Sequence, residues 1–345
     1  MDDKPISLSP TRFADLQGWA EDDHAAAFRA FLRSCAADPE LPHAADALTL
    51  GPGANAPAAR AFFEDWFLPH VIADSGRPGF VTGYYDPEIE GSYVRQGPFQ
   101  VPVYRRPGDL ITLAPETERA RFNERITGLR GTADGQVPYY TRAEIWEGAL
   151  SGRGLELLYL KDMVELFYMQ VQGSGQVHLK EGGAVRLGYD GKNGHPYTSI
   201  GWLLIERGAI APEAMSMAAV KAWLGADEAR GRALMEENRS YVFFRELDAD
   251  DGRDGPRGAQ GVALTPGRSL AVDTAYHRLG LPVFVTAADL VTEGQPFRRL
   301  MIAQDVGSAI RGPERGDIFW GTGDGAGAIA GSTRHAARFS ILLPK

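Results

Sequence analysis

The sequence predicts a mainly β protein with peripheral helices and a small closed barrel, and its last hundred residues are expected to be all-β. Two observations support this fold class. Short β-branched or aromatic runs recur toward the C-terminus and are separated by glycine, proline or charged turns. The chain also contains 41 glycines and 22 prolines. Many strands must therefore turn tightly or pass close to another backbone, which favours a closed barrel over a doubly wound sheet.

Helical signals gather in the first and middle parts of the chain. The segment "EDDHAAAFRAFLRSCAA" (21–37) places Cys35 on an apolar stripe, so we expect its thiol to be buried. The segment "AARAFFEDWFL" (58–68) places four aromatic residues on one helical face. These are Phe62, Phe63, Trp66 and Phe67.

Two further helices are predicted from their start signals. Thr141 and Glu144 form a capping box at the start of "TRAEIWEGAL" (141–150). Pro212 lies just inside "APEAMSMAAVKAWLG" (211–225), where proline suits the first turn of a helix. We therefore expect one helix in each segment.

Six later segments read as strands because they are short, apolar and bounded by turn residues. They are 240–246, 269–273, 281–287, 299–305, 317–321 and 338–344. Between the first two lies "DADDGRDGPRGAQG" (248–261), which is polar and rich in glycine. This stretch is the best candidate for a linker or a mobile loop.

Composition excludes several classes of protein. The 345 residues are 44% hydrophobic and 23% charged, which is typical of a globular chain, and the net charge is −9. An acidic average field repels a phosphate backbone, and no lysine or arginine run offsets it, so no nucleic-acid partner is expected. The segment "MDDKPISLSP" lacks the features of a signal peptide, and no run of about 18 apolar residues occurs. Taken alone, these features fit a cytoplasmic protein or a mature secreted one.

Common cofactor and nucleophile motifs are absent. "QGSGQV" (172–177) shares only its first two glycines with a dinucleotide fingerprint, and "GAGAIA" (325–330) leaves too little chain for a βαβ unit. The seven histidines and single cysteine show no metal-ligand spacing, and no G-x-S-x-G sequence occurs. We therefore expect no cofactor and no metal, and carboxylate chemistry remains.

Two stretches are the candidates for that chemistry. "RLMIAQDVGSAIRGPERGDIFWGTGDG" (299–325) sets Asp305 and Asp317 at strand ends, each near glycine. "GFVTGYYDPEIEGS" (79–92) carries Tyr84 and Tyr85, whose flat faces and hydroxyl tips suit sugar rings. An alternative is that one tyrosine packs inward while the other covers a turn.

Together these stretches and four others resemble the membrane-bound lytic murein transglycosylase A family. The motifs follow the family's order and cover roughly residues 80 to 321. They are "VTGYYDP", "MQVQGSG", "GKNGHPYTSIG", "NRSYVFF", "GAQGVALTPGRSLAVD" and "RLMIAQDVGSAIRGPERGDIFWG".

The resemblance implies a double-psi β-barrel domain, formed by residues 1–87 and 247–345, with a second, smaller β-barrel domain inserted at 88–246. A substrate groove between the two domains is also implied, because ligand sites commonly form at such borders.

The resemblance further implies that Asp317 is the catalytic acid. Asp305 is a candidate supporting carboxylate, with the alternative that it only holds a turn, and Asp273 is interpreted as structural. The substrate-binding candidates are Thr82, Tyr84, Tyr85, Gln172, Gly173, Ser174 and Gly175.

The implied reaction cleaves the β-1,4 bond between N-acetylmuramic acid and N-acetylglucosamine in peptidoglycan without water and forms 1,6-anhydromuramic acid ends. Peptidoglycan strands are then the partner, with a cell-wall synthesis complex as a further one, and a monomer is expected. The family implies a periplasmic protein associated with the outer membrane, whose leader or lipid anchor is not in this chain. Alternatives are a non-catalytic peptidoglycan-binding module, a hydrolytic muramidase with two carboxylates and a cytoplasmic β-rich scaffold.

Overall fold

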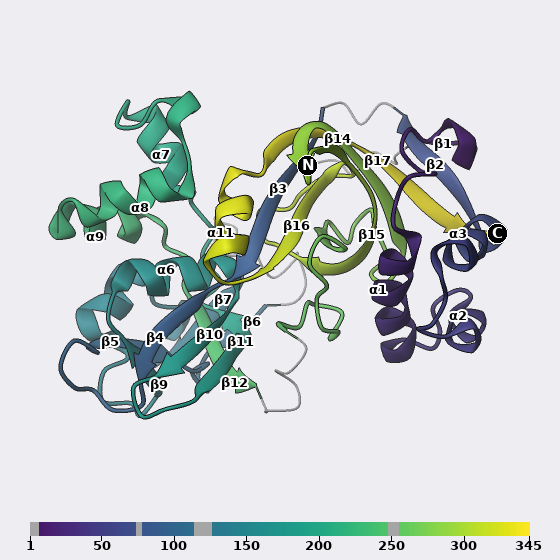
Figure 1. Ribbon diagram of the computed structural model, residues 1–345. Coiled ribbons are helices and arrows are strands. Elements are labelled where there is room, and N and C mark those ends of the chain that lie inside the picture. Colours follow the sequence, from purple (N-terminus) through teal and green to yellow (C-terminus); the bar gives the residue numbers. More distant parts are fainter. Residues whose placement is uncertain (1–6, 74–77, 114–125, 248–254) are drawn as a thin grey trace. The chain divides into compact units, whose positions relative to one another are not determined.

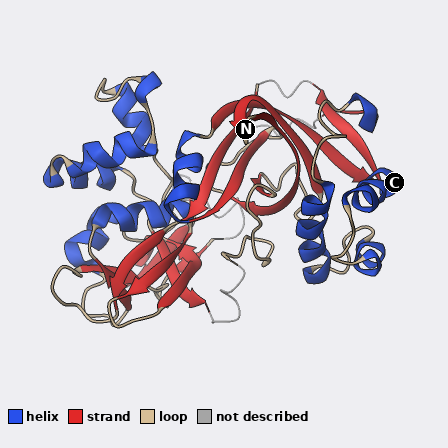
Figure 2. Cartoon of the chain, viewed as in Figure 1, coloured by secondary structure: helices blue, strands red, loops and turns tan. Residues whose placement is uncertain are grey.

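The computed structural model describes residues 7–73, 78–113, 126–247 and 255–345. The chain divides into two compact units (Figure 1). Unit 1 comprises Met1–Tyr85 and Asp254–Lys345, and unit 2 comprises Asp86–Arg253. Strands form the centre of each unit and helices lie beside them (Figure 2). The fold class is therefore mainly β with peripheral helices, as predicted.

Unit 1 is built on a closed six-stranded barrel. Its sheet has eight strands in the order β1-β2-β17-β14-β15-β13-β16-β3, and an additional β17–β3 pairing closes the last six into a barrel. β13 pairs parallel with β15 and antiparallel with β16. The strands are β1 (Ser7–Pro10), β2 (Phe67–Ala73), β3 (Gly79–Asp86), β13 (Ser269–Val272), β14 (Pro282–Thr292), β15 (Gln295–Val306), β16 (Arg315–Thr322) and β17 (Arg334–Pro344). The closed barrel was predicted, but the expectation that the last hundred residues are all-β is wrong, because helix α11 (Gly323–Ser332) lies among them.

The barrel interior is filled by alternate residues of these strands. They form one apolar cluster that includes Val81, Leu270, Val283, Met301, Ile318 and Phe339. Because strand side chains alternate between faces, the neighbours of these residues point outward. This alternation decides which polar side chains of β3 and β16 share one face.

Helices pack on unit 1 through a second apolar cluster. Cys35 is fully buried within it, as predicted. Phe62, Phe63 and Phe67 also belong to this cluster, but Trp66 is 38% exposed and stacks on His43 instead. The expectation of four aromatics on one face is wrong for Trp66, because the helix ends there and Phe67 begins β2. The helices are α1 (His24–Ala37), α2 (Ala44–Leu50), α3 (Ala56–Trp66), α11 (Gly323–Ser332) and the 3-10 turn η1 (Phe13–Asp15).

Unit 2 contains a second six-stranded sheet in the order β12-β11-β10-β4-β9-β5. A bridge between Arg105 and Phe244 joins the two ends, so this sheet also curls into a barrel. Its strands are β4 (Glu88–Ser92), β5 (Val101–Tyr104), β9 (Glu156–Leu160), β10 (Ser174–Leu179), β11 (Ala184–Lys192) and β12 (Val242–Leu247). A smaller sheet contains β6 (Ile111–Thr112), β7 (Gly128–Thr132) and β8 (Gly135–Pro138).

The helices of unit 2 confirm one prediction and correct another. The capping box of Thr141 and Glu144 is present and starts α5 (Arg142–Glu144), which continues as the π-helical turn η3 (Ile145–Ala149). The predicted single helix over 211–225 is instead a 3-10 turn, η4 (Pro212–Ala214), followed by α8 (Met217–Gly225). The two separate because the Ser216 side chain accepts from Ala219 N–H and so caps a new helix. The other helices are α6 (Met163–Gln172), α7 (Ile200–Glu206) and α9 (Glu228–Glu237).

The predicted borders at 87/88 and 246/247 differ from those of the compact units by two residues at the first border and seven at the second. Whether each unit is a domain that folds by itself stays a prediction. Of the predicted linker 248–261, residues 248–254 lie outside the described part of the chain.

Candidate functional site

Asp305 and Asp317 lie in one row across the barrel wall of unit 1. Ala271 on β13 pairs in register with Asp305 on β15 and with Asp317 on β16. Residues paired in register point to the same face of a sheet, so both carboxylates face outward on either side of a small side chain. β3 is the next strand beyond β16. Its Thr82 and Tyr84 face the same side as the carboxylates, because Val81, which precedes Thr82 on the strand, points into the barrel core.

Among the described residues, Asp317 accepts a hydrogen bond on one of its two oxygens. The Thr82 hydroxyl donates to Asp317 Oδ1 at 2.6 Å, and the Arg315 guanidinium donates to Thr82 Oγ1 at 2.8 Å. Within the described ranges, no hydrogen bond to Oδ2 is formed. Asp317 thus keeps one oxygen open.

The surroundings of Asp317 hold its pKa well above the ordinary value. Burial raises the pKa from 3.8 to about 6, and the negative charge of Asp305 adds to this rise. The hydrogen bond from Thr82 and the positive charge of Arg315 act in the opposite direction. A carboxyl of this kind is partly protonated near neutral pH and can act as a general acid.

Asp305 differs because both of its oxygens are engaged. Tyr84 donates its hydroxyl to Oδ2 at 2.8 Å, and the backbone N–H groups of Ala259 and Val306 each donate to Oδ1 at 2.9 Å. Burial raises the pKa of Asp305, and these three donors oppose the rise because they favour the carboxylate. Asp305 is therefore held as an acceptor on both oxygens in this arrangement.

A buried polar network fixes the loop that supplies Ala259. Gln304 donates to Ser34 Oγ and to the Ala30 carbonyl of α1, each at 2.8 Å, and Ser34 donates to Gln260 Oε1 at 2.8 Å. Gln260 follows Ala259 directly in the chain. The network thus holds the Ala259 N–H against Asp305.

Phe319 and Trp320 lie on opposite faces of β16, as strand alternation predicts. Phe319 packs against the Tyr84 ring, with 5.3 Å between ring centroids, so it supplies apolar surroundings on the site face. Trp320 packs on Phe297 inside the barrel, where Gly83 leaves room for its indole.

Asp273 binds backbone at a turn. It accepts from Gly312 N–H at 2.8 Å and from Ala275 N–H at 3.2 Å. None of the hydrogen bonds described for residues 255–345 joins it to Asp305 or Asp317. This position supports the structural interpretation of the third aspartate.

Of the predicted substrate-binding residues, three lie in unit 1. The hydroxyls of Thr82 and Tyr84 are committed to the two carboxylates, and Tyr85 is buried at 5% exposure. A Cβ on Gly327 of α11 would approach the Tyr85 ring to 2.8 Å. One tyrosine therefore packs inward, as in the alternative considered for this pair, but the other binds Asp305 instead of covering a turn.

The other four lie in unit 2 at the end of α6. Gln172 is the last residue of α6, and Gly173 follows with a left-handed φ of 84°, which glycine adopts without strain. Ser174 donates to Asp86 at 2.6 Å, and Gly175 fits against the Met169 side chain, which a Cβ there would approach to 2.8 Å. These residues form a tight helix-to-strand turn.

Arg315, Ala259 and Ala271 are site residues that sequence reasoning missed. Arg315 had a signal, because it precedes Asp317 by two positions on a strand and so shares its face. Ala259 and Ala271 had none, because a backbone N–H and a small side chain carry no chemical signature in sequence.

The described part of the chain contains neither a cluster of metal ligands nor a helix suited to span a membrane. No group of three or more histidine, cysteine, aspartate or glutamate side chains there is arranged to hold a metal ion. Among the described helices, none is both long enough and apolar enough to span a membrane.

Comparison with known proteins assigns a family to both parts of the chain. Residues 80–245 match the family model described as the MltA specific insert domain. Residues 268–343 match the model described as the 3D domain, and this range contains Asp273, Asp305 and Asp317.

Individual relatives agree with these matches. A membrane-bound lytic murein transglycosylase A from Vibrio cholerae is 36% identical over 263 residues, which are 74% of this chain and 63% of that protein. The chain thus spans less than two thirds of the length of this curated relative. The crystal structure of a membrane-bound lytic murein transglycosylase from Agrobacterium tumefaciens is 36% identical, covers 98% of both chains and has a TM-score of 0.88. A crystal structure of Escherichia coli MltA with bound chitohexaose is 30% identical, covers 99% of this chain and 95% of that one, and has a TM-score of 0.71.

Proposed function

The chain belongs to the membrane-bound lytic murein transglycosylase A family, and from this premise we propose that it is a peptidoglycan lytic transglycosylase. The enzyme cleaves the β-1,4 bond between N-acetylmuramic acid and N-acetylglucosamine without adding water. The product is a glycan end that carries 1,6-anhydromuramic acid.

The observation that carries this proposal is the difference between the two carboxylates. Asp317 has a free Oδ2 and a pKa raised to about 6, whereas Asp305 accepts three hydrogen bonds on its two oxygens. One side chain is thus suited to carry a proton and the other to remain an anion. A site with one proton-carrying carboxyl fits the non-hydrolytic cleavage, which needs a single acid.

Asp317 acts twice in the proposed reaction. It first protonates the glycosidic oxygen, so that the bond to the leaving sugar breaks with charge developing on the muramic acid ring. As a carboxylate it then accepts the proton of the C6 hydroxyl, while the C6 oxygen attacks C1 and closes the 1,6-anhydro ring. A hydrolase needs a second carboxylate to activate water or to form a covalent intermediate. Here the nucleophile is part of the substrate at high effective concentration, so that requirement falls away.

Asp305 supports this cycle without exchanging a proton. Its charge raises the pKa of Asp317 and so favours the acid form before bond cleavage. A fixed anion on the same face also stabilises positive charge that develops on the sugar ring. We assign glycan binding to the turn of Gln172, Gly173, Ser174 and Gly175 in unit 2, where a Cβ on Gly173 would meet no atom within 4 Å, so a sugar can approach the backbone there.

Digestion of purified sacculi followed by mass spectrometry tests the proposal. The wild-type chain should release muropeptides with anhydro ends, and Asp317→Asn should lower turnover by about 10²- to 10⁴-fold, which is the usual contribution of general acid–base catalysis. Products heavier by one water would favour the hydrolytic muramidase. Co-sedimentation with sacculi and no released product would favour the non-catalytic binding module.

The names of the relatives extend the proposal to location and partners. Because they are called membrane-bound, we infer that this chain acts at a membrane. We further propose, from the family resemblance, that this is the periplasmic side of the outer membrane and that the chain acts there as a monomer on peptidoglycan strands. A role in a cell-wall synthesis complex is part of the same inference. Fractionation of cells that produce the native protein, with crosslinking before lysis, tests both.

A further inference from the structure

We propose that Arg315 and Thr82 act as positioning residues that select Oδ2 of Asp317 as the oxygen that carries the acid proton. The inference rests on the proposed function, because it assigns atoms within the same site. It concerns a chain of two hydrogen bonds, from Arg315 to Thr82 and from Thr82 to Asp317.

The donor inventory fixes the direction of the first hydrogen bond, and the first bond favours the direction of the second, because a threonine oxygen that accepts from a guanidinium turns its own proton away from that cation. A guanidinium has only donors, so in the 2.8 Å contact Arg315 donates and Thr82 Oγ1 accepts. The Thr82 hydroxyl has a single proton, and its 2.6 Å contact to Asp317 Oδ1 uses that proton. Oδ1 of Asp317 is thereby fixed as an acceptor.

An acid whose Oδ1 is an acceptor carries its proton on Oδ2. In a neutral carboxyl the carbonyl oxygen accepts hydrogen bonds better than the hydroxyl oxygen, so the bond from Thr82 favours the tautomer with the proton on Oδ2. This is also the oxygen that no hydrogen bond from the described residues reaches. The proton therefore sits on the oxygen that remains open to a substrate.

Arg315 is itself held so that its orientation is defined. It donates to the carbonyl of Gly316 and lies 5.5 Å from the centroid of the Phe80 ring. Without Arg315, the Thr82 hydroxyl could turn its proton elsewhere and accept a hydrogen bond from a protonated Oδ1 of Asp317. The preference for the tautomer with the proton on Oδ2 would then weaken. The arginine thus acts on Asp317 through the threonine.

The charged and titratable groups that face Asp317 are few. Arg315 comes from its own strand, Asp305 from β15 and Tyr84 from β3, and the exposed Arg334 of β17 pairs in register with Thr82. β13 presents the uncharged Ala271 at this register, and the charged residue at the start of α11, Asp324, is exposed. Thr82 and Arg315 both lower the pKa of Asp317, so the loss of either should raise it.

Four variants test the inference on soluble peptidoglycan fragments: Thr82→Val, Thr82→Ser, Arg315→Met and the double variant of Thr82→Val with Arg315→Met. At a pH below the basic limb of the rate profile, Thr82→Val should lower kcat by about 10- to 100-fold with KM changed less than about threefold, because a hydrogen bond to the carboxylate that forms as Asp317 gives up its proton is lost. Thr82→Ser keeps the hydroxyl and is the matched control, with kcat within about threefold of wild type. As a single variant, Arg315→Met should lower kcat. In the Thr82→Val background it should cause almost no further loss of kcat.

Two results would overturn the inference. One is additive losses in the double variant, because Arg315 would then act independently of Thr82. The other comes from carboxyl ¹³C NMR titration of the free protein, in which the Asp317 signal is assigned by its absence in Asp317→Asn. Thr82→Val and Arg315→Met should each raise the pKa of Asp317. An unchanged pKa in both variants contradicts the hydrogen-bonded relay from Arg315 through Thr82 to Asp317.

The NMR titration needs no substrate, so it separates this inference from the proposed function. If wild-type protein forms no anhydro ends while both variants shift the pKa, the proposed function is wrong and the hydrogen-bonded relay stands. If wild-type protein forms anhydro ends and neither variant shifts the pKa or kcat, the function stands and the relay is wrong.

Discussion

Asp305 and Asp317 are separated in the barrel wall by one residue, Ala271, which pairs in register with both. Two strand spacings therefore lie between their backbones, or about 10 Å. At such a separation two carboxylates on one face influence each other electrostatically without competing for one proton. The negative charge of Asp305 raises the pKa of Asp317 accordingly.

Removal of that charge should shift the pH dependence of the reaction. In Asp305→Asn the pKa of Asp317 falls, so Asp317 loses its proton at lower pH and the basic limb of the rate profile moves to lower pH. Asparagine can keep the bonds from Ala259 and Val306, because its amide oxygen still accepts. Initial rates on soluble peptidoglycan fragments across pH measure the shift.

Asp324→Asn is the matched control for Asp305→Asn. It removes one negative charge from the exposed start of α11 and should leave the basic limb in place. If Asp305→Asn instead abolished turnover at every pH, Asp305 would take part in bond making. The hydrolytic mechanism with two carboxylates would then replace the one with a single acid.

Asp317 should lower the stability of the folded protein at neutral pH. Its folded-state pKa of about 6 lies above the ordinary 3.8, so the folded state binds the proton more tightly than the unfolded state. Stability from this group is therefore complete below pH 3.8 and is lost as the pH rises through 6. Asp317→Asn should raise the free energy of unfolding above pH 7 by up to about 3 kcal/mol, which is the equivalent of this shift.

Urea unfolding of wild type and Asp317→Asn at several pH values checks this. The difference between the two proteins should be largest above pH 7 and should close as the pH falls toward 4. A constant difference at all pH values would mean that the carboxyl is not destabilised by burial. The raised pKa that makes Asp317 an acid would then have no basis.

Much of the barrel could be predicted because each strand is a short apolar run between turn residues. The segments 299–305 and 317–321 fall inside β15 and β16, and "RFSILLP" falls inside β17. The pairing of these strands could not be predicted. β3 closes the barrel through Thr82–Arg334, and no local pattern specifies a partner 252 residues away.

The two acids of the site could be predicted from the sequence, but the hydrogen bonds that hold them could not. Asp305 and Asp317 stand out as polar residues at strand ends, but the hydroxyls that bind them come from β3, more than 200 residues earlier. Thr82 and Tyr84 were identified through a family motif, and their bonds to the carboxylates depend on barrel closure. Local sequence thus identifies the functional side chains, and closure of the barrel determines which of them come into contact.

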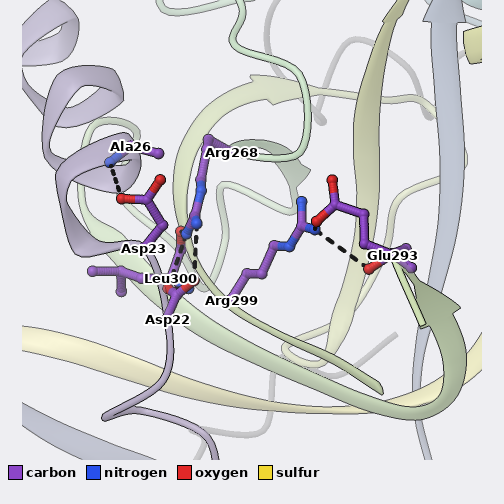
Figure 3. A network of polar contacts seen from close by, with 8 residues as sticks. Asp22, Asp23, Ala26, Arg268, Glu293, Arg299 and Leu300 are labelled. Carbon is purple, nitrogen blue, oxygen red and sulfur yellow. Dashed lines mark hydrogen bonds and ion pairs between the residues drawn. The ribbon is translucent and has the colours of Figure 1, made fainter. Parts of the chain in front are cut away.

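Asp22 should be important for the stability of unit 1. It forms a two-pronged ion pair with Arg268, in which both side chains are nearly buried, and it also accepts from Leu300 N–H at 2.7 Å (Figure 3). Asp22→Asn leaves the Arg268 charge buried without its counterion, so we expect a loss of about 3–5 kcal/mol in the free energy of unfolding. Urea denaturation at neutral pH measures it.

Glu293→Gln is the matched control within the same network. Glu293 pairs with Arg299 at 3.4 Å but is 87% exposed, so its removal should change stability by no more than about 0.5 kcal/mol (Figure 3). Equal losses in Asp22→Asn and Glu293→Gln would show that burial does not set the strength of these ion pairs.

Gly83 should tolerate no side chain, although its backbone has no unusual conformation. A Cβ there would lie 2.5 Å from Trp320 Nε1 and 2.9 Å from the Ala330 Cα, so the indole or α11 would have to move. Because Gly83 stands between Thr82 and Tyr84, this movement would displace the two hydroxyls that bind Asp317 and Asp305. Gly83→Ala should lower the free energy of unfolding by about 1–3 kcal/mol, the usual cost of overpacking, and should reduce turnover further than that loss alone explains.

Gly53→Ala is the control, because a Cβ there would meet no atom within 4 Å, and it should leave both measurements unchanged. Full turnover in Gly83→Ala would contradict the close packing of β3 on Trp320, because the site could then form without it.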